Sequence, residues 1–184
     1  MGDVKKKGKQ YFKKGKVLWV LKYGDRLYGK VLGGYPYYVE VSIKGGKNRC
    51  TCPIGKDCKH VSAVLEALKS GEYHETLNPL VELSPQAVVD EIIFGNLEIG
   101  KPIILKELIY YINHDESGSE AARLFRKAFA LLKREFSAEF YESLQIQFEE
   151  FKRIFYDYGF TEELERELED LKKFTSNNLA SSSP

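Results

Sequence analysis

The feature that most constrains this chain of 184 residues is a cluster of cysteine and histidine residues in its first third. All three cysteines and one of the three histidines lie between positions 50 and 60. They form a Cys-x-Cys pair and, after five intervening residues, a Cys-x-His pair: Cys50, Cys52, Cys58 and His60. Three sulfur donors and one imidazole make up the ligand set of a closed tetrahedral metal site. The cluster therefore predicts a structural metal site, and Zn²⁺ tolerates this mixed set best.

Other roles for these residues fit the sequence less well. Cysteines that serve only as small buried side chains should scatter over core positions, whereas these lie among Pro53, Gly55, Lys56 and Asp57. A disulfide would leave one thiol over, and no signal peptide precedes the cluster. An iron–sulfur cluster is the main rival centre, and a catalytic zinc ion would need an open coordination position. Clustered thiols favour a reducing environment, so we expect a cytoplasmic protein.

The residues before the cluster predict a small antiparallel β-meander. Apolar, β-branched and aromatic side chains dominate residues 17–23 and 26–32, and glycine follows each run. Residues 37–43 alternate between apolar and polar side chains, the period of a strand with one buried face. The glycines after this strand are well suited to a tight turn, because glycine accepts positive φ angles. The meander would deliver Cys50 and Cys52 at the end of a strand and in its turn.

The residues after the cluster predict a helix. Apolar side chains recur there at helical spacing: Val61, Val64, Leu65 and Leu68. Asp57 is the expected N-cap, so that Cys58 and His60 would occupy the first helical turn. A metal ion bound there would clamp the meander to the helix and supply much of the folding free energy of so small a unit. The Thr51 hydroxyl and nearby backbone amides are candidate hydrogen-bond donors to the thiolates.

The ligand spacing resembles that of a known zinc-binding module. The pattern Cys50-x-Cys52-x5-Cys58-x-His60 is similar to the SWIM zinc finger, whose signature is Cys-x-Cys, a variable gap and Cys-x-His. Ala63 extends the match to the Cys-x-His-x-x-Ala form of the SWIM proteins that act with recombinase paralogues. On this resemblance we expect a zinc-binding SWIM fold.

The resemblance covers about residues 11–70 and is more specific for the fold than for the biological role. SWIM modules occur in chromatin remodellers, transposases, ubiquitin ligases and recombination mediators. The resemblance implies DNA binding or protein–protein contact and assigns no reaction.

Charge divides the chain into a basic and an acidic part. Residues 1–60 contain 15 Lys and Arg against 4 Asp and Glu, a net charge of +11, whereas residues 61–184 contain 13 against 23, a net charge of −10. A basic surface with aromatic side chains such as Tyr11 and Phe12 suits phosphate contact combined with base stacking. This pattern predicts DNA or RNA as a partner of the basic part.

Six basic residues are the candidate nucleic-acid contacts: Lys13, Lys14, Lys47, Arg49, Lys56 and Lys59. The alternatives are that the lysines only aid solubility, or that the basic part docks against the acidic half of the chain. Tyr11 and Phe12 could likewise belong to the core of a first strand.

The remainder of the chain predicts helices, so the expected fold class is α+β: a SWIM-like meander with its helix, then an all-α bundle. The expected domains are residues 1–74 (zinc-binding), 75–84 (linker), 85–176 (acidic helices) and 177–184 (a disordered tail, because it is small and polar). Ser84 with Pro85 would open the first helix, to about Phe94. A second helix is expected over 103–112, after Gly100 and Pro102, and Thr161 would cap the last one.

Three apolar stripes at helical spacing predict the core of the bundle. They comprise Ala121, Phe125, Ala128, Leu132 and Phe136; then Leu144, Phe148, Phe151, Phe155 and Tyr158; then Leu164, Leu168 and Leu171. The alternative is that the third stripe stays open for a protein partner.

Motifs of known enzyme classes are absent from the sequence. There is no phosphate-binding loop, no dinucleotide-binding glycine fingerprint and no Gly-x-Ser-x-Gly motif. No run of about twenty apolar residues predicts a membrane span. We therefore expect a non-enzymatic zinc protein that binds nucleic acid as an accessory factor in recombination, repair or transcription. The alternatives are an adaptor that contacts only proteins, and an accessory domain of a helicase or nuclease.

Overall fold

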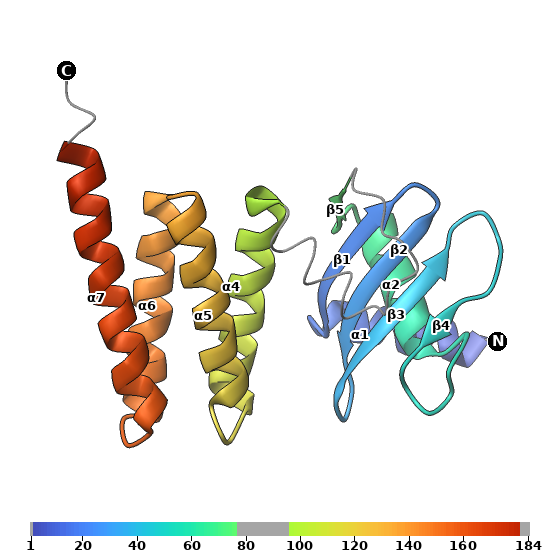
Figure 1. The fold of residues 1–184 in the computed structure, drawn as a ribbon. Coiled ribbons are helices and arrows are strands. Elements are labelled where there is room, and N and C mark those ends of the chain that lie inside the picture. The colour runs from blue at the N-terminus through green and yellow to red at the C-terminus, as the bar shows by residue number, and fades with distance from the viewer. Residues whose placement is uncertain (1, 77–95, 181–184) are drawn as a thin grey trace. The chain divides into compact units, whose positions relative to one another are not determined.

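The computed structural model describes residues 2–76 and 96–180, with side chains described as far as position 173. The chain divides into two compact units, Met1–Ile92 and Ile93–Pro184. In the described residues, the first unit combines a sheet with helices, and the second is helical (Figure 1). The expected α+β fold, a meander with its helix followed by a helical bundle, is confirmed.

The first unit is built on a five-stranded sheet with the order β4-β3-β2-β1-β5. Its elements along the chain are α1 (Gly2–Lys13), β1 (Val17–Tyr23), β2 (Arg26–Leu32), β3 (Pro36–Ser42), β4 (Arg49–Cys50), α2 (Lys59–Lys69) and β5 (His74–Glu75). Strands β1 to β4 form the predicted antiparallel meander. Strand β5 is an unexpected addition that pairs in parallel with β1, so the sheet is mixed.

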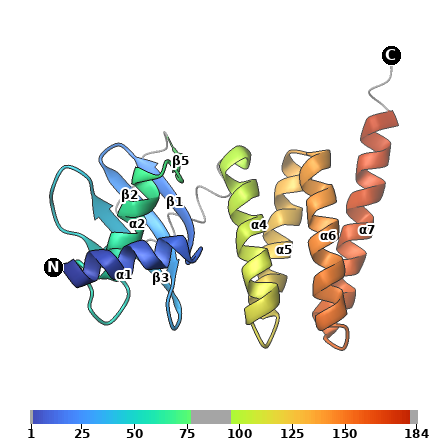
Figure 2. The same cartoon turned by 180° about the vertical axis from the view of Figure 1, so that it is seen from behind.

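Helices α1 and α2 lie on the same face of the sheet (Figure 2). Helix α2 packs directly on the sheet, and the apolar side chains on one face of the helix contact the inward-facing residues of the strands. This core contains Val20, Leu27, Val31, Val39, Val41, Val61, Val64 and Ala67. Gly29 permits the close approach, since a Cβ atom there would lie 2.6 Å from Cγ2 of Val64.

Helix α1 was not expected from the sequence. Tyr11 and Phe12 lie in this helix and not in a first strand, and both pack against the core at its edge. Gly8 is the buried residue of α1, and a Cβ atom there would come within 2.4 Å of the Cβ of Ser62 on α2. The helix was hard to predict because it has few apolar residues among many lysines, and its packing against α2 stabilises it.

The start of α2 also differs from the prediction. Cys58, and not Asp57, is the N-cap residue, and it makes no side-chain capping hydrogen bond. Asp57 lies one position earlier with a left-handed φ of 43°. Its carboxylate accepts a hydrogen bond from Nδ2 of Asn48 at 2.9 Å, so it supports the loop and not the helix.

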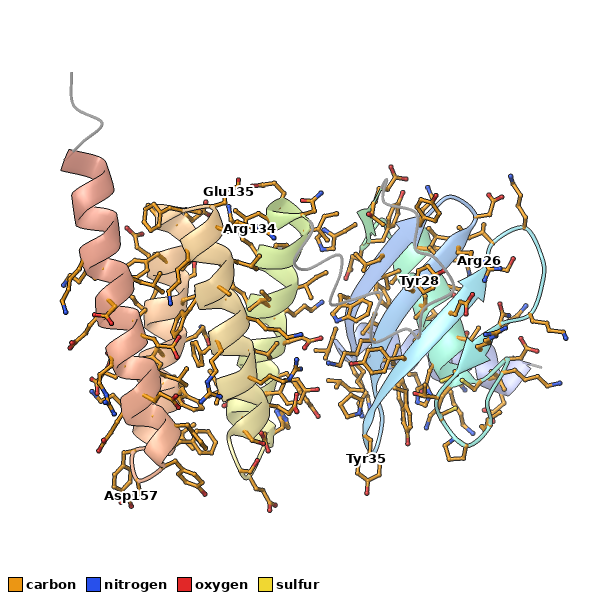
Figure 3. The ribbon with its side chains drawn as sticks, in the orientation of Figure 1. Arg26, Tyr28, Tyr35, Arg134, Glu135 and Asp157 are labelled. Atoms are coloured by element: carbon orange, nitrogen blue, oxygen red, sulfur yellow. The ribbon has the colours of Figure 1, made fainter. Side chains whose placement is uncertain are left out.

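The second unit is an antiparallel helical bundle. Its helices are α4 (Leu97–His114), α5 (Ser119–Arg134), α6 (Ala138–Ile154) and α7 (Gly159–Ala180). Glu135, between α5 and α6, and Asp157, between α6 and α7, lie at opposite ends of the bundle (Figure 3). The helix expected between Ser84 and Phe94 lies outside the described residues.

The helix boundaries depart from the predictions at three places. Helix α4 begins at Leu97 behind Asn96, whose side chain caps it, and continues through Pro102. Helix α7 begins at Gly159, so Thr161 is not its cap; its hydroxyl donates to the carbonyl of Phe155 at 2.6 Å. Helix α7 also continues to Ala180, within the segment predicted to be disordered.

The predicted stripes form most of the core of the bundle. Phe125, Phe148 and Phe151 are fully buried, and Phe125 meets the other two rings edge to face, with ring centroids 5.3–5.5 Å apart. Phe136 and Tyr158 were assigned to these stripes wrongly, because each follows the end of its helix and is exposed.

The third stripe is part of the same core. Leu164, Leu168 and Leu171 are 0%, 9% and 1% exposed. The alternative that this stripe remains open for a protein partner is therefore wrong. Among the helices of residues 2–76 and 96–180, none combines the length and apolar character that crossing a membrane requires.

Candidate metal centre

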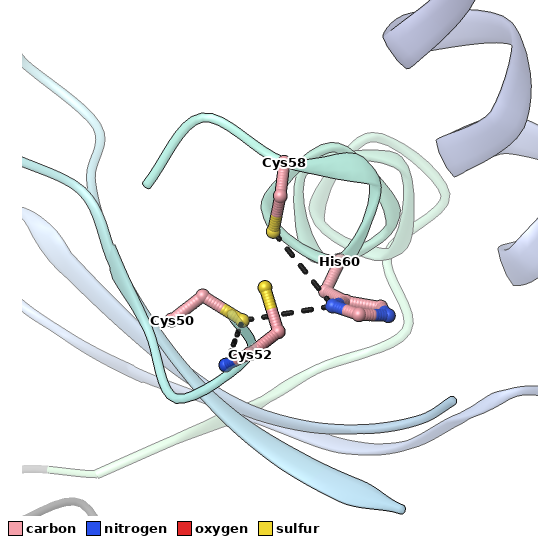
Figure 4. Close-up of side chains that lie close together, drawn as sticks. All are labelled: Cys50, Cys52, Cys58 and His60. Atoms are coloured by element: carbon pink, nitrogen blue, oxygen red, sulfur yellow. Dashed lines mark hydrogen bonds between the residues drawn. The ribbon is translucent and has the colours of Figure 1, made fainter. Parts of the chain in front are cut away.

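The four predicted ligands come together at the junction between the meander and α2. Cys50 ends β4, Cys52 lies in the turn after it, and Cys58 and His60 lie at the start of α2. Figure 4 shows the three sulfur atoms and Nδ1 of His60 facing a common centre. The four donor atoms all lie within 4.8 Å of one another.

The distances fit a tetrahedral zinc ion. Nδ1 of His60 lies 3.6 Å from Sγ of Cys50 and 3.7 Å from Sγ of Cys58. Zn–S bonds of about 2.3 Å and a Zn–N bond of about 2.0 Å, at tetrahedral angles, place sulfur and nitrogen about 3.5 Å apart. The imidazole nitrogen therefore lies at the spacing from Cys50 and Cys58 that Zn²⁺ requires.

The site is closed to solvent. The three cysteines and His60 are each less than a tenth exposed. Four buried protein ligands leave no position for water or substrate, which is the arrangement of structural and not of catalytic zinc. The ion would hold together two elements that are connected only by a short loop.

The hydrogen bonds among the donors show how the thiols share protons without the metal. The hydrogen bond from Cys50 and, to a smaller extent, the contact with His60 lower the pKa of Cys58 to about 3, against the opposing effect of burial. The same hydrogen bond to Cys58 raises the pKa of Cys50, and burial raises it further. One thiolate thus forms readily, while Cys50 must release its proton when the metal binds.

The backbone of residues 50–57 is held by its own hydrogen bonds. The amide of Cys50 donates to the carbonyl of Gly55 at 2.8 Å, and the amide of Gly55 donates to the carbonyl of Cys52 at 2.9 Å. Gly55 adopts a positive φ of 75°, which explains glycine at this point of the turn.

The predicted hydrogen bonds to the thiolates are only partly present. The amide of Cys52 donates to Sγ of Cys50 at 3.5 Å, as expected of a nearby backbone group. The prediction for the Thr51 hydroxyl was wrong: it accepts a hydrogen bond from the amide of Tyr38 at 3.0 Å. Thr51 therefore fastens the turn to β3.

Comparison with known proteins agrees with this geometry. The SWIM zinc finger family matches residues 39–69, the segment that contains β4, all four ligands and α2. Residues 39–69 form a SWIM zinc finger. Zn²⁺ is the ion that this family and this donor set imply.

Comparison with whole proteins adds one distant relative. An uncharacterized protein of Methanocaldococcus jannaschii is 29% identical over 128 residues, which cover 69% of this chain and 51% of the relative. The chain thus spans about half the length of that protein. No solved structure matches the chain significantly.

The SWIM finger holds its histidine by aromatic contacts. Nε2 of His60 is buried and has no hydrogen-bond partner among the described residues. Metal-bound histidines usually donate this second N–H to an oxygen acceptor, which fixes the ring. Here Tyr37 stacks on the imidazole with ring centroids 4.7 Å apart, and Tyr11 of α1 meets it edge-on at 5.5 Å.

A glycine makes this packing possible. A Cβ atom on Gly33 would lie 2.5 Å from Cε2 of Tyr37 and 3.2 Å from Nε2 of His60. The roles of Tyr11, Gly33 and Tyr37 were not predicted, because only the fold brings these distant positions to His60. Of these three residues, Tyr11 was recognisable in the sequence as an aromatic side chain in the basic N-terminal segment.

The six candidate nucleic-acid contacts fall into three places. Lys47, Arg49 and Lys56 surround one concave surface beside the ligands. Lys59 lies over the ring of Tyr11, 4.6 Å from its centroid, together with Lys16 at 4.9 Å. Lys13 and Lys14 are exposed at the end of α1 and form no ion pair with a described residue.

Proposed function

We propose that the chain is a nucleic-acid-binding accessory factor, with the first unit as the binding module. The observation that carries this proposal is the uncompensated positive charge of that unit. Residues 1–92 contain 16 Lys and Arg against 10 Asp and Glu, a net charge of +6, and residues 93–184 contain 12 against 17, a net charge of −5.

The local pairing of charges sharpens this argument. The acidic side chains of residues 1–60 are all engaged within the first unit: Asp3 with Lys7, Asp25 with Lys44, Glu40 with Arg26, and Asp57 with the amide of Asn48. Exposed cations of the same segment are left without such partners among the described residues, among them Lys5, Lys6, Lys9, Lys13, Lys47, Arg49 and Lys56. Exposed, unpaired cations are what phosphate contacts require.

The zinc ion has a structural role in this proposal. It fixes β4 and the loop between Cys52 and Cys58, which carry Arg49 and Lys56, and four buried ligands leave the ion no open position. A non-enzymatic factor of this kind fits recombination, repair or transcription, inside the cell where thiols stay reduced. The acidic helical unit would then contact proteins.

A salt-titrated binding assay tests the proposal. Fluorescence anisotropy with single-stranded and duplex oligonucleotides should show binding at low salt that weakens linearly on a plot of log K against log salt concentration. Absence of binding to either oligonucleotide at low salt would refute the proposal and favour the adaptor function, in which both units contact proteins only.

A further inference from the structure

A concave surface beside the zinc ligands carries three neighbouring cations. It encloses about 480 Å³, and its walls include Lys47, Arg49 and Lys56. All three side chains are exposed, and none forms an ion pair or hydrogen bond with another described residue. We call this surface the basic concavity. Like charges gathered at one place repel each other, so the arrangement favours a bound anion.

The frame of the basic concavity is held in place by hydrogen bonds. The side chain of Asn48 links two segments: its Oδ1 accepts from the amide of Ser42 at 3.1 Å, and its Nδ2 donates to Asp57 at 2.9 Å. Asp57 is the carboxylate in the wall, and this bond engages one of its oxygens. Cys50 and Cys58, which flank the segment that contains Ile54 and Lys56, are two of the candidate metal ligands.

An exposed apolar side chain stands in the same wall. Ile54 is 67% exposed and belongs to the loop between Cys52 and Cys58. An isoleucine held at the tip of a metal-bound turn offers an apolar contact beside the cations. Together these side chains match a phosphate group with an adjoining sugar or base.

We infer that the basic concavity holds one backbone phosphate of a nucleic acid, with Arg49 as a two-pronged hydrogen-bond donor and Ile54 against the neighbouring sugar. This inference rests on the proposed function and deepens it, because it assigns a position to one phosphate. Arginine suits this role, since its planar guanidinium pairs with two oxygens at once.

The surroundings favour a nucleic acid over an acidic peptide. Asn48 and Asp57 also line an adjacent groove between α1 and α2, whose lining includes Lys5 and the ion pair of Lys69 with Glu66. Lys5 therefore offers a further unpaired cation on the α1 side of the basic concavity. Successive phosphates of one strand can contact cations at both places.

The first test is a substitution that keeps the net charge. Arg49→Lys retains the positive charge and removes the planar pair of donors. We expect affinity for the better-bound oligonucleotide to fall about fivefold, because a two-pronged contact becomes a single one. A purely diffuse electrostatic attraction predicts no change, and that result would overturn the assignment.

The second test compares two variants that lose the same charge. Lys47→Gln with Lys56→Gln removes two cations from the basic concavity, and Lys6→Gln with Lys9→Gln removes two exposed, unpaired cations from α1. We expect the first variant to bind about tenfold more weakly and to lose about 0.7–0.9 from the salt slope per lost contact. The α1 variant should weaken binding less. Zinc content and circular dichroism would verify that both remain folded.

The outcomes separate this inference from the proposed function. Equal weakening by the two double variants would overturn the phosphate position while nucleic-acid binding itself stands. If the concavity variant loses affinity for an acidic peptide and keeps its affinity for nucleic acid, the inference is also wrong. No binding by the unaltered protein would refute the proposed function instead. Titration with inorganic phosphate should shift the amide resonances of Gly55 and the side chain of Asn48, and unchanged resonances there would contradict the inference.

Discussion

The two units of this chain reach a stable fold by different means. The helical unit contains most of the large side chains that are fully buried, among them the interlocking rings of Phe125, Phe129, Phe148 and Phe151. In the first unit, the core cluster between the sheet and α2 consists mainly of valines and alanines, together with three cysteines that surround the metal site. Small side chains bury little apolar area, so this layer depends on the metal ion for energy that the helical unit obtains from aromatic packing.

The largest expected effect comes from removing a ligand. Cys58→Ser should abolish the cooperative unfolding transition of the first unit, because structural zinc supplies roughly 10–16 kcal/mol of binding free energy in comparable small domains. The transition of the helical unit should persist. Differential scanning calorimetry of the full chain would show this, with His114→Ala as a control that leaves both transitions in place.

A substitution in the aromatic core tests the helical unit in the same way. Phe151→Ala should destabilise the helical unit by about 3–5 kcal/mol, since it empties the centre of the aromatic core. Zinc content and the transition of the first unit should not change. Loss of zinc in this variant would show that the two units do not fold independently.

Acidification should act only on the first unit. Its thiols must be deprotonated to bind zinc, and Cys50, whose pKa is raised by its hydrogen bond to Cys58, still carries a proton at neutral pH in the metal-free protein. For each proton that zinc binding releases, the zinc affinity should fall about tenfold when the pH falls by one unit. Competition with a chromophoric chelator between pH 8 and pH 6 measures this slope. A flat profile would contradict thiolate ligation.

A smaller effect is expected where aromatic rings hold His60. Tyr37→Ala removes the ring stacked on the imidazole, and the zinc dissociation rate should rise about tenfold, as for loss of other groups that orient metal ligands. Tyr35→Ala is the matched control, because Tyr35 lies in the preceding turn, is 75% exposed and points away from the sheet (Figure 3). Equal dissociation rates for the two variants would show that stacking does not position the histidine.

The sequence was most informative where structure depends on neighbours along the chain. The ligand cluster, the meander and the apolar stripes of the bundle were predicted because spacing within a few residues determines them. Helix α1, strand β5 and the role of Tyr37 were not, since each is stabilised by a partner far away in the sequence. Pro102 misled the prediction of α4, whose packing and Asn96 cap outweigh the hydrogen bond that proline removes.

Native mass spectrometry of the intact chain, with elemental analysis of the same sample, tests the central claim most directly. The account predicts about one zinc ion per chain, and a chelator should release it together with the fold of the first unit alone. Iron in place of zinc, a disulfide among Cys50, Cys52 and Cys58, or a first unit that stays folded after chelation would contradict it.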